Sequence, residues 1–183
     1  MLFLSAVLLA VVLGYAFGGR LKNLGALHVR YVGLVMIALV IQLLVFPLFS
    51  ARPIIPFGTT AFHTLSYVLV FAFLVFNLKL WPLLVVGAGA LLNVLVIAVN
   101  GGRMPVSMDA LEATGAVTMV QYLTDSPIYG NVVRMSDATR MNFLGDVLYF
   151  PEWFPLATAF SAGDVLIIIG LVWLIVKGMR CHG

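Results

Sequence analysis

All seven acidic residues of this 183-residue chain lie between Asp109 and Asp164. Outside that stretch the chain is a series of long apolar blocks, separated by basic residues or by proline and glycine. Hydrophobic residues make up 63% of the chain and charged residues only 9%, whereas a soluble domain has about 25% charged residues. An apolar run of about 20 residues is long enough to cross a bilayer as a helix. The pattern therefore predicts a multi-spanning membrane protein.

Five apolar segments meet or approach the length of a span. Their apolar runs are continuous rather than alternating, and only helices or closed barrels satisfy the backbone in lipid. We therefore expect an all-α, polytopic bundle of five transmembrane helices, forming a single integral membrane domain over residues 1–183. The residues at 100–160 are expected to form a semi-structured loop outside the cell. The expected spans are about 1–17, 31–49, 61–78, 81–99 and 161–177.

The lysines and arginines predict the orientation, because cytoplasmic loops carry an excess of them. An N-terminus outside the cell puts six of the ten basic residues in the cytoplasm: Arg20, Lys22, Arg30, Lys79, Lys177 and Arg180. The four left outside are Arg52, Arg103, Arg134 and Arg140. The sequence thus predicts a membrane protein with its N-terminus outside the cell and its C-terminus in the cytoplasm.

Composition also narrows the kinds of partner and cofactor. The single cysteine, Cys181, excludes an internal disulfide and a CxxC-type metal or redox site. The basic residues are spread over short loops without a clustered patch, so no nucleic-acid partner is expected. No cofactor or metal site is expected either. The partners that remain are the lipid bilayer, a lipid-like ligand, and a second copy of the chain or a partner membrane protein.

Polar residues gather at the expected outer boundary of the membrane. The run Asn100-Gly-Gly-Arg-Met-Pro-Val-Ser107 leaves the fourth span, Phe-Leu-Gly-Asp146-Val lies late in the loop, and Gly-Asp164-Val-Leu opens the fifth span. A glycine pair lets the backbone approach a ligand closely, and an arginine can bind an anionic head group. The candidate ligand-binding residues are Asn100, Gly101, Gly102, Arg103, Asp146, Asp164, His63 and Asn93.

Each candidate also has a purely structural explanation. Gly101 and Gly102 before a proline are typical of a turn after a helix. Asp164 follows Ser161 with the spacing of a capping box. Arg103 is more simply explained as an ion pair with Asp146 or Asp164 that fastens the loop than as a ligand clamp.

The remaining candidates lie within the expected spans. Asn93 and Gln42 are explained by hydrogen bonds between helices, which are common inside membranes. His63 has no second histidine on its side of the membrane, which argues against a haem or zinc site. A triad of Ser107, His63 and an aspartate lacks a nucleophile-elbow signature.

The chain resembles a family of small multi-pass bacterial membrane proteins of unknown function. The resemblance rests on Asn100-Gly-Gly-Arg-Met-Pro-Val106, on Gly-Asp-Val-Leu at the start of the last helix, and on Gly18-Gly-Arg-Leu-Lys-Asn-Leu24. It covers almost the whole chain and implies a bacterial plasma-membrane protein, but it transfers no catalytic residue.

Three functions remain open. The leading hypothesis is non-enzymatic: the outer face binds a lipid-like or amphiphilic ligand or docks a partner membrane subunit. The alternative is a membrane enzyme acting on a lipid-linked or phosphorylated substrate at the outer leaflet. In that case Asp146 or Asp164 would be the base or a metal ligand, and Arg103 the anion clamp. The third hypothesis is a passive channel or transporter, which would need a hydrated path past Gln42 and Asn93.

Overall fold

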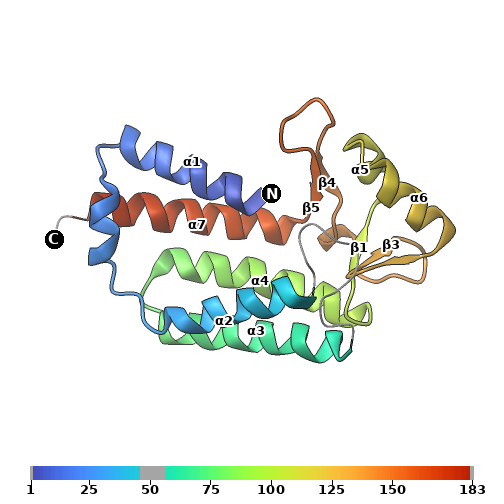
Figure 1. The fold of residues 1–183 in the computed structure, drawn as a ribbon, viewed down its shortest axis with the longest axis horizontal. Coiled ribbons are helices and arrows are strands. Elements are labelled where there is room, and N and C mark those ends of the chain that lie inside the picture. The colour runs from blue at the N-terminus through green and yellow to red at the C-terminus, as the bar shows by residue number, and fades with distance from the viewer. Residues whose placement is uncertain (1, 46–56, 182–183) are drawn as a thin grey trace. The chain divides into compact units, whose positions relative to one another are not determined.

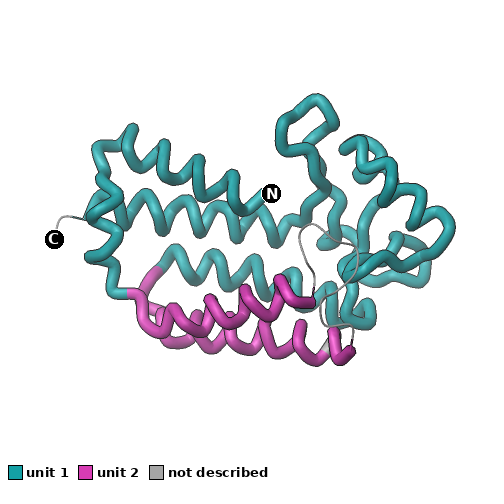
Figure 2. The backbone as a smooth tube through the Cα atoms, viewed as in Figure 1, with its two compact units in different colours: residues 1–28, 81–183 teal, residues 29–80 magenta. Residues whose placement is uncertain are grey.

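The computed structural model describes residues 2–45 and 57–181, and their secondary structure is mostly helical. The chain divides into two compact units, one formed by residues 1–28 and 81–183 and the other by residues 29–80 (Figure 2). The five apolar segments expected to be spans coincide with five α-helices. These are α1 (Leu2–Ala16), α2 (Val32–Val45), α3 (Thr59–Phe76), α4 (Trp81–Val99) and α7 (Ala162–Arg180).

The first unit is organised around α7, which lies between α1 and α4 (Figure 1). Small residues allow these helices to approach closely. Ala6, Ala10 and Gly14 of α1 are buried, and a Cβ atom at Gly170 of α7 would lie 2.7 Å from the carbonyl oxygen of Pro82. Backbone therefore packs directly against backbone along this part of α7, as is common between helices in membranes.

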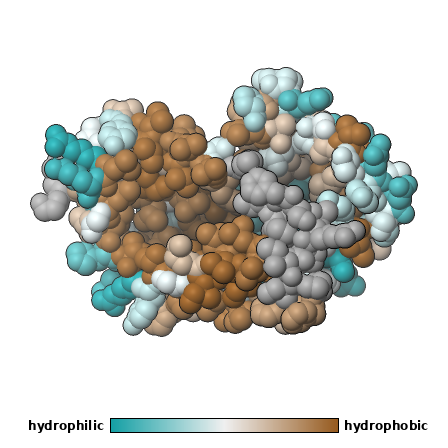
Figure 3. Space-filling view, viewed as in Figure 1, coloured by the Kyte–Doolittle hydropathy of each residue, from teal (hydrophilic) through white to brown (hydrophobic). Residues whose placement is uncertain are grey.

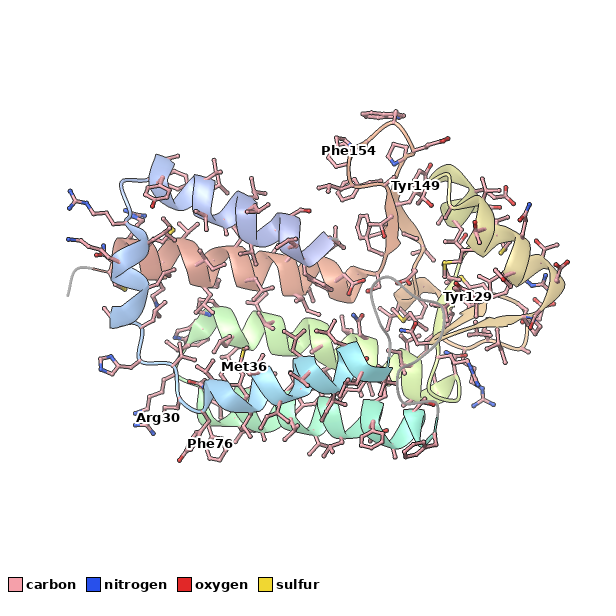
Figure 4. All side chains as sticks on the ribbon, viewed as in Figure 1. Arg30, Met36, Phe76, Tyr129, Tyr149 and Phe154 are labelled. Carbon is pink, nitrogen blue, oxygen red and sulfur yellow. The ribbon has the colours of Figure 1, made fainter. Side chains whose placement is uncertain are left out.

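The second unit is a pair of helices, α2 and α3. Gln42 of α2 donates from Nε2 to Oγ of Ser66 on α3, at 2.6 Å, as the sequence predicted for a polar residue between two spans. Asn77 closes the end of the pair, because its Oδ1 accepts from the Arg30 amide and its Nδ2 donates to the Arg30 carbonyl, each at 2.8 Å. Figure 4 shows Arg30 and Phe76 at this end.

Residues 100–160 form a small folded region of short elements, and here the all-α prediction is wrong. The reason is local, because Pro105, Pro127 and Gly130 interrupt helices while β-branched residues such as Val132 favour strands. A three-stranded sheet has the order β1-β3-β2, with β1 parallel and β2 antiparallel to β3. The elements are β1 (Met104–Val106), α5 (Met108–Ala113), α6 (Val117–Asp125), β2 (Ile128–Tyr129), β3 (Val132–Arg134), the 3-10 helix η2 (Asn142–Leu144), β4 (Leu148–Phe150) and β5 (Thr158–Phe160).

The core of this region is built from α6 and the sheet. Leu123 of α6 is fully buried, and Val106 of β1 is only 1% exposed. Ser107 caps α5 by accepting a hydrogen bond from the Ala110 amide at 3.3 Å, and the helix ends before Gly115, as the sequence predicted. The region therefore has a core of its own rather than being an extended linker.

The helices carry their large apolar side chains on the outside. Leu4, Leu8 and Val12 lie on one face of α1 and are each at least 60% exposed. Figure 3 shows hydrophobic residues in brown over the helices, and large exposed apolar surfaces mark contacts with a membrane or a partner protein.

Within the described residues, α4 and α7 are long and apolar enough to cross a membrane, a criterion of length and composition only. The other apolar helices are shorter: α1, with 15 residues, spans about 22 Å, less than the hydrocarbon thickness of about 30 Å. Helix length and composition thus support two membrane spans, and the other three predicted spans stay a prediction.

Candidate functional site

A closed hydrogen-bond network joins α4 to the start of α7. Ser161 is the N-cap of α7: its Oγ accepts from the Asp164 amide at 3.0 Å, and Asp164 Oδ2 accepts from the Ser161 amide at 2.9 Å. The capping box predicted from the sequence is confirmed. Asn93 of α4 extends it, because Asn93 Nδ2 donates to Asp164 Oδ1 at 2.8 Å and Ser161 Oγ donates to Asn93 Oδ1 at 2.9 Å. Both oxygens of Asp164 are therefore occupied.

Asp146 lies beside this network and is held by its backbone. Its amide donates to the Pro105 carbonyl at 2.9 Å, and its carbonyl accepts from the Ser107 amide at 3.1 Å. These bonds attach residue 146 to the edge of β1 as an isolated parallel bridge with Val106. The carboxyl group itself makes no hydrogen bond or ion pair with the part of the chain that the structure describes.

The surroundings of Asp146 make it an unusual carboxyl group. Burial, and after it the negative charge of Asp164, raise the pKa of Asp146 to about 7. Two nearby carboxylates disfavour double ionisation, and a buried one is further disfavoured by desolvation. The site thus holds one fully bonded carboxylate, Asp164, and one half-buried carboxyl group, Asp146, whose pKa is raised to about 7.

The turn that leaves α4 is built by the glycine pair and an asparagine. Gly101 and Gly102 have φ values of +67° and +85°, a conformation that favours glycine. Asn100 fastens the turn to residue 140: Asn100 Nδ2 donates to the Arg140 carbonyl and the Arg140 amide donates to Asn100 Oδ1, both at 2.8 Å. Asn100, Gly101 and Gly102 are therefore explained by the turn that they form.

The ion pair expected between Arg103 and Asp146 or Asp164 is not formed among the described residues. Arg103 Nη1 donates to the carbonyl of Gly101 at 3.5 Å. The pKa of Asp146 is raised, whereas a guanidinium beside its carboxyl group would lower it. The predicted ion pair is wrong because the glycine pair, with its positive φ values, turns the chain so that Arg103 contacts its own turn.

His63 lies on α3, in the other compact unit, and only 6% of its surface is exposed. Its ring packs edge-on against Tyr67, with centroids 4.6 Å apart. Within the described residues, no group of three or more histidine, cysteine, aspartate or glutamate side chains is placed to hold a metal ion.

An aromatic hairpin continues from the polar network. It consists of β4, β5 and their connection at 151–157. Because Leu148 pairs with Phe160, Asp146 and Ser161 both lie at the base of this hairpin. The ring of Phe150 stacks on Phe154 at 4.8 Å and contacts Phe160 at 4.9 Å.

The rim of the hairpin is exposed. Trp153, in the connection, is 83% exposed, and Tyr149, on β4, is 48% exposed. Figure 4 labels Tyr149 and Phe154 on the hairpin. The aromatic residues of the hairpin were not predicted to belong to the site, although they lie close in sequence to both Asp146 and Asp164.

Fold and site together define a mostly helical protein with two helices that could span a membrane and a small folded region after the first of them. The chain belongs to a family of unknown function, DUF5317, which matches residues 26–176. It is also 28% identical over 171 residues to an uncharacterized protein of Thermotoga maritima, covering 92% of this chain and 84% of that protein. No solved structure matches the chain.

Proposed function

We propose that the protein is a five-span plasma-membrane protein that binds a lipid-like amphiphile at its outer face. Its N-terminus is outside the cell, and its C-terminus is in the cytoplasm. The exposed apolar faces of the helices support insertion in a bilayer, since such surfaces mark membrane contact. The shorter helices would be accommodated by tilt or local thinning of the bilayer.

One observation carries the binding proposal: the half-buried carboxyl group of Asp146, which has no hydrogen-bond partner among the described residues, lies at the base of an exposed aromatic hairpin. The Asp146 carboxyl group is open to a partner from outside the chain, because its oxygens form no hydrogen bond with the described residues. A ligand with a hydroxyl or ammonium head group would supply the missing bond. Its apolar part would lie against the aromatic rings, as expected for an amphiphile.

Tyr149 and Trp153 fit the same arrangement. Tyrosine and tryptophan are enriched where a protein meets the membrane–water boundary. In the proposed topology the hairpin directly precedes the last span, so its rings are at the depth of lipid head groups. The ligand can therefore enter from the outer leaflet without leaving the membrane.

We expect Asp146→Ala to reduce retention of the amphiphile at least tenfold, because a hydrogen bond to the ionised carboxylate contributes about 1.5–3 kcal/mol. Native mass spectrometry of protein purified in mild detergent measures the fraction that carries a bound amphiphile. The matched control is Asp137→Ala, which removes an exposed carboxylate in the same region. A wild-type protein without any bound amphiphile, or equal loss in both variants, would contradict the proposal.

The enzymatic alternative has one supporting observation. A carboxyl group with a pKa near 7 is suited to general acid–base catalysis at neutral pH. Arg103, with its guanidinium not paired to a carboxylate among the described residues, would bind the phosphate of a lipid-linked substrate. Conversion of the retained amphiphile over time by wild type, but not by Asp146→Ala, would favour the enzyme over the binding protein.

A further inference from the structure

The end of the first unit away from the aromatic hairpin carries a fixed group of basic residues. The 3-10 helix η1 (Leu21–Ala26) lies against the C-terminal turn of α7. This contact brings together two basic residues at the start of η1 and two in the last turn of α7. We name this set the basic platform: Arg20, Lys22, Lys177 and Arg180.

Hydrogen bonds to a backbone carbonyl group, rather than ion pairs of the basic side chains, hold η1 against the end of α7. The carbonyl oxygen of Met179 accepts from the Arg20 amide and from Asn23 Nδ2, both at 2.8 Å. Met179 is fully buried, and a Cβ atom at Gly178 would meet the side chains of Leu24 and Leu27. A free helix end would leave its last carbonyl groups without partners. Here η1 supplies donors, so the position of its basic residues is fixed.

Among the described residues, the side chains of the platform form no ion pair with a carboxylate. All four side chains are exposed. The nearest acidic residues in sequence are Asp109 and Asp164, and α7 separates Asp164 from Lys177 by 13 residues, or about 20 Å. Lys177 and Arg180 are three residues apart and therefore share one face of α7. The platform is thus a local concentration of four positive charges.

Apolar and aromatic side chains flank the platform on the membrane side. Leu21 is 44% exposed, Phe17 is 60% exposed and Tyr15 is 53% exposed. Figure 3 shows hydrophilic residues at this end, directly beside the hydrophobic surface of the helices. A charged group next to an exposed apolar surface suits the boundary between head groups and acyl chains.

We infer that the basic platform binds the head groups of anionic phospholipids in the inner leaflet. Clusters of four or more basic residues beside a membrane helix attract anionic lipids, at about 1 kcal/mol for each cation. A fixed platform loses less side-chain and loop entropy on binding than a mobile loop with the same charge. The inference rests on the proposed membrane insertion and orientation, but not on the amphiphile bound at Asp146.

The test is binding of short-chain phosphatidylglycerol to the purified full-length chain in neutral detergent, measured as a dissociation constant. We expect Lys177→Gln with Arg180→Gln to weaken this binding at least tenfold. The charge-preserving pair Lys177→Arg with Arg180→Lys should bind as the wild type does. The matched control is Arg134→Gln with Arg140→Gln, which removes two cations from the other end of the same unit and should leave binding unchanged.

Further measurements show whether binding depends on the anionic head group, on the acyl chains or on both. Phosphatidylcholine and free glycerol phosphate should bind at least tenfold more weakly than phosphatidylglycerol, and rising salt should weaken the phosphatidylglycerol complex. Equal binding of all three ligands, or equal loss in both glutamine pairs, would overturn the inference. Asp146→Ala should leave phosphatidylglycerol binding intact, so that failure of the platform and failure of the outer site are distinguishable.

Discussion

Replacing Asp146 by asparagine should make the protein more stable above pH 7 and remove a pH-dependent loss of stability. The folded state raises the pKa of Asp146 from 3.8 to about 7. Protonated Asp146 is therefore favoured by folding. The stabilisation that this proton provides is complete below the unfolded pKa and is lost as pH rises through the folded pKa. Since one unit of pKa corresponds to about 1.4 kcal/mol, the full effect is about 4 kcal/mol.

The measurement is the midpoint of thermal or denaturant unfolding of purified protein between pH 4 and pH 8. Asp146→Asn keeps the shape of the side chain and cannot ionise, so the difference between variant and wild type should grow across this window. Asp137→Asn, which changes an exposed carboxylate, should follow the wild-type curve. A variant that runs parallel to the wild type at every pH would show that Asp146 is not held protonated by the fold.

Replacing Gly89 by alanine should separate α4 from α7. A Cβ atom at residue 89 would meet the carbonyl oxygen of Gly163 and would lie 2.9 Å from the Ile167 amide nitrogen. Both atoms are backbone and cannot rotate away, so one helix must shift. Overpacking of this kind costs about 1–3 kcal/mol, against a gain of at most about 1 kcal/mol from the higher helix propensity of alanine.

Gly33→Ala is the matched control, because it also lies in a helix but its Cβ atom would meet nothing within 4 Å. Unfolding of the purified variants should show a lower midpoint for Gly89→Ala and an unchanged or slightly higher one for Gly33→Ala. Asn93 lies four residues after Gly89, so the Asn93–Asp164 hydrogen bond should also weaken. Equal midpoints for both variants would mean that α4 and α7 do not pack in this way.

The helices could be predicted because their signal is continuous. The segment 81–99 corresponds to α4 without a shift, and the start of α7 follows from the capping residues Ser161 and Asp164. A capping box involves only four consecutive residues, so it can be recognised from the sequence without knowledge of the tertiary structure. The predicted span at 31–49 agrees with α2 as far as Val45, and residues 46–49 lie outside the described part of the chain.

The candidate site could be predicted only in part. Asn93 was expected to form a hydrogen bond between helices and Asp164 to cap the last helix, and the structure joins these two side chains directly. The partner of Arg103 could not be deduced, because it depends on the direction in which two glycines with positive φ turn the chain. The unusual state of Asp146 was also hidden, since it results from burial and from Asp164, 18 residues away in sequence.

The strands of the region at 100–160 were missed for a similar reason. Each has only two or three residues, and β1 pairs with β3 across almost 30 residues of chain. Pairing between such distant segments is decided by the shared core around Leu123 and Val106 rather than by local propensity.

The central claim, a membrane protein with residues 100–160 outside and the C-terminus inside, is tested most directly by the native cysteine. Cys181 is the single cysteine of the chain and lies just after α7. In intact cells a membrane-impermeant thiol reagent should leave Cys181 unlabelled and should label it once the membrane is opened. With Cys181→Ser as background, Ala138→Cys in the exposed 100–160 region should be labelled in intact cells. Labelling of Cys181 before the membrane is opened would contradict the account.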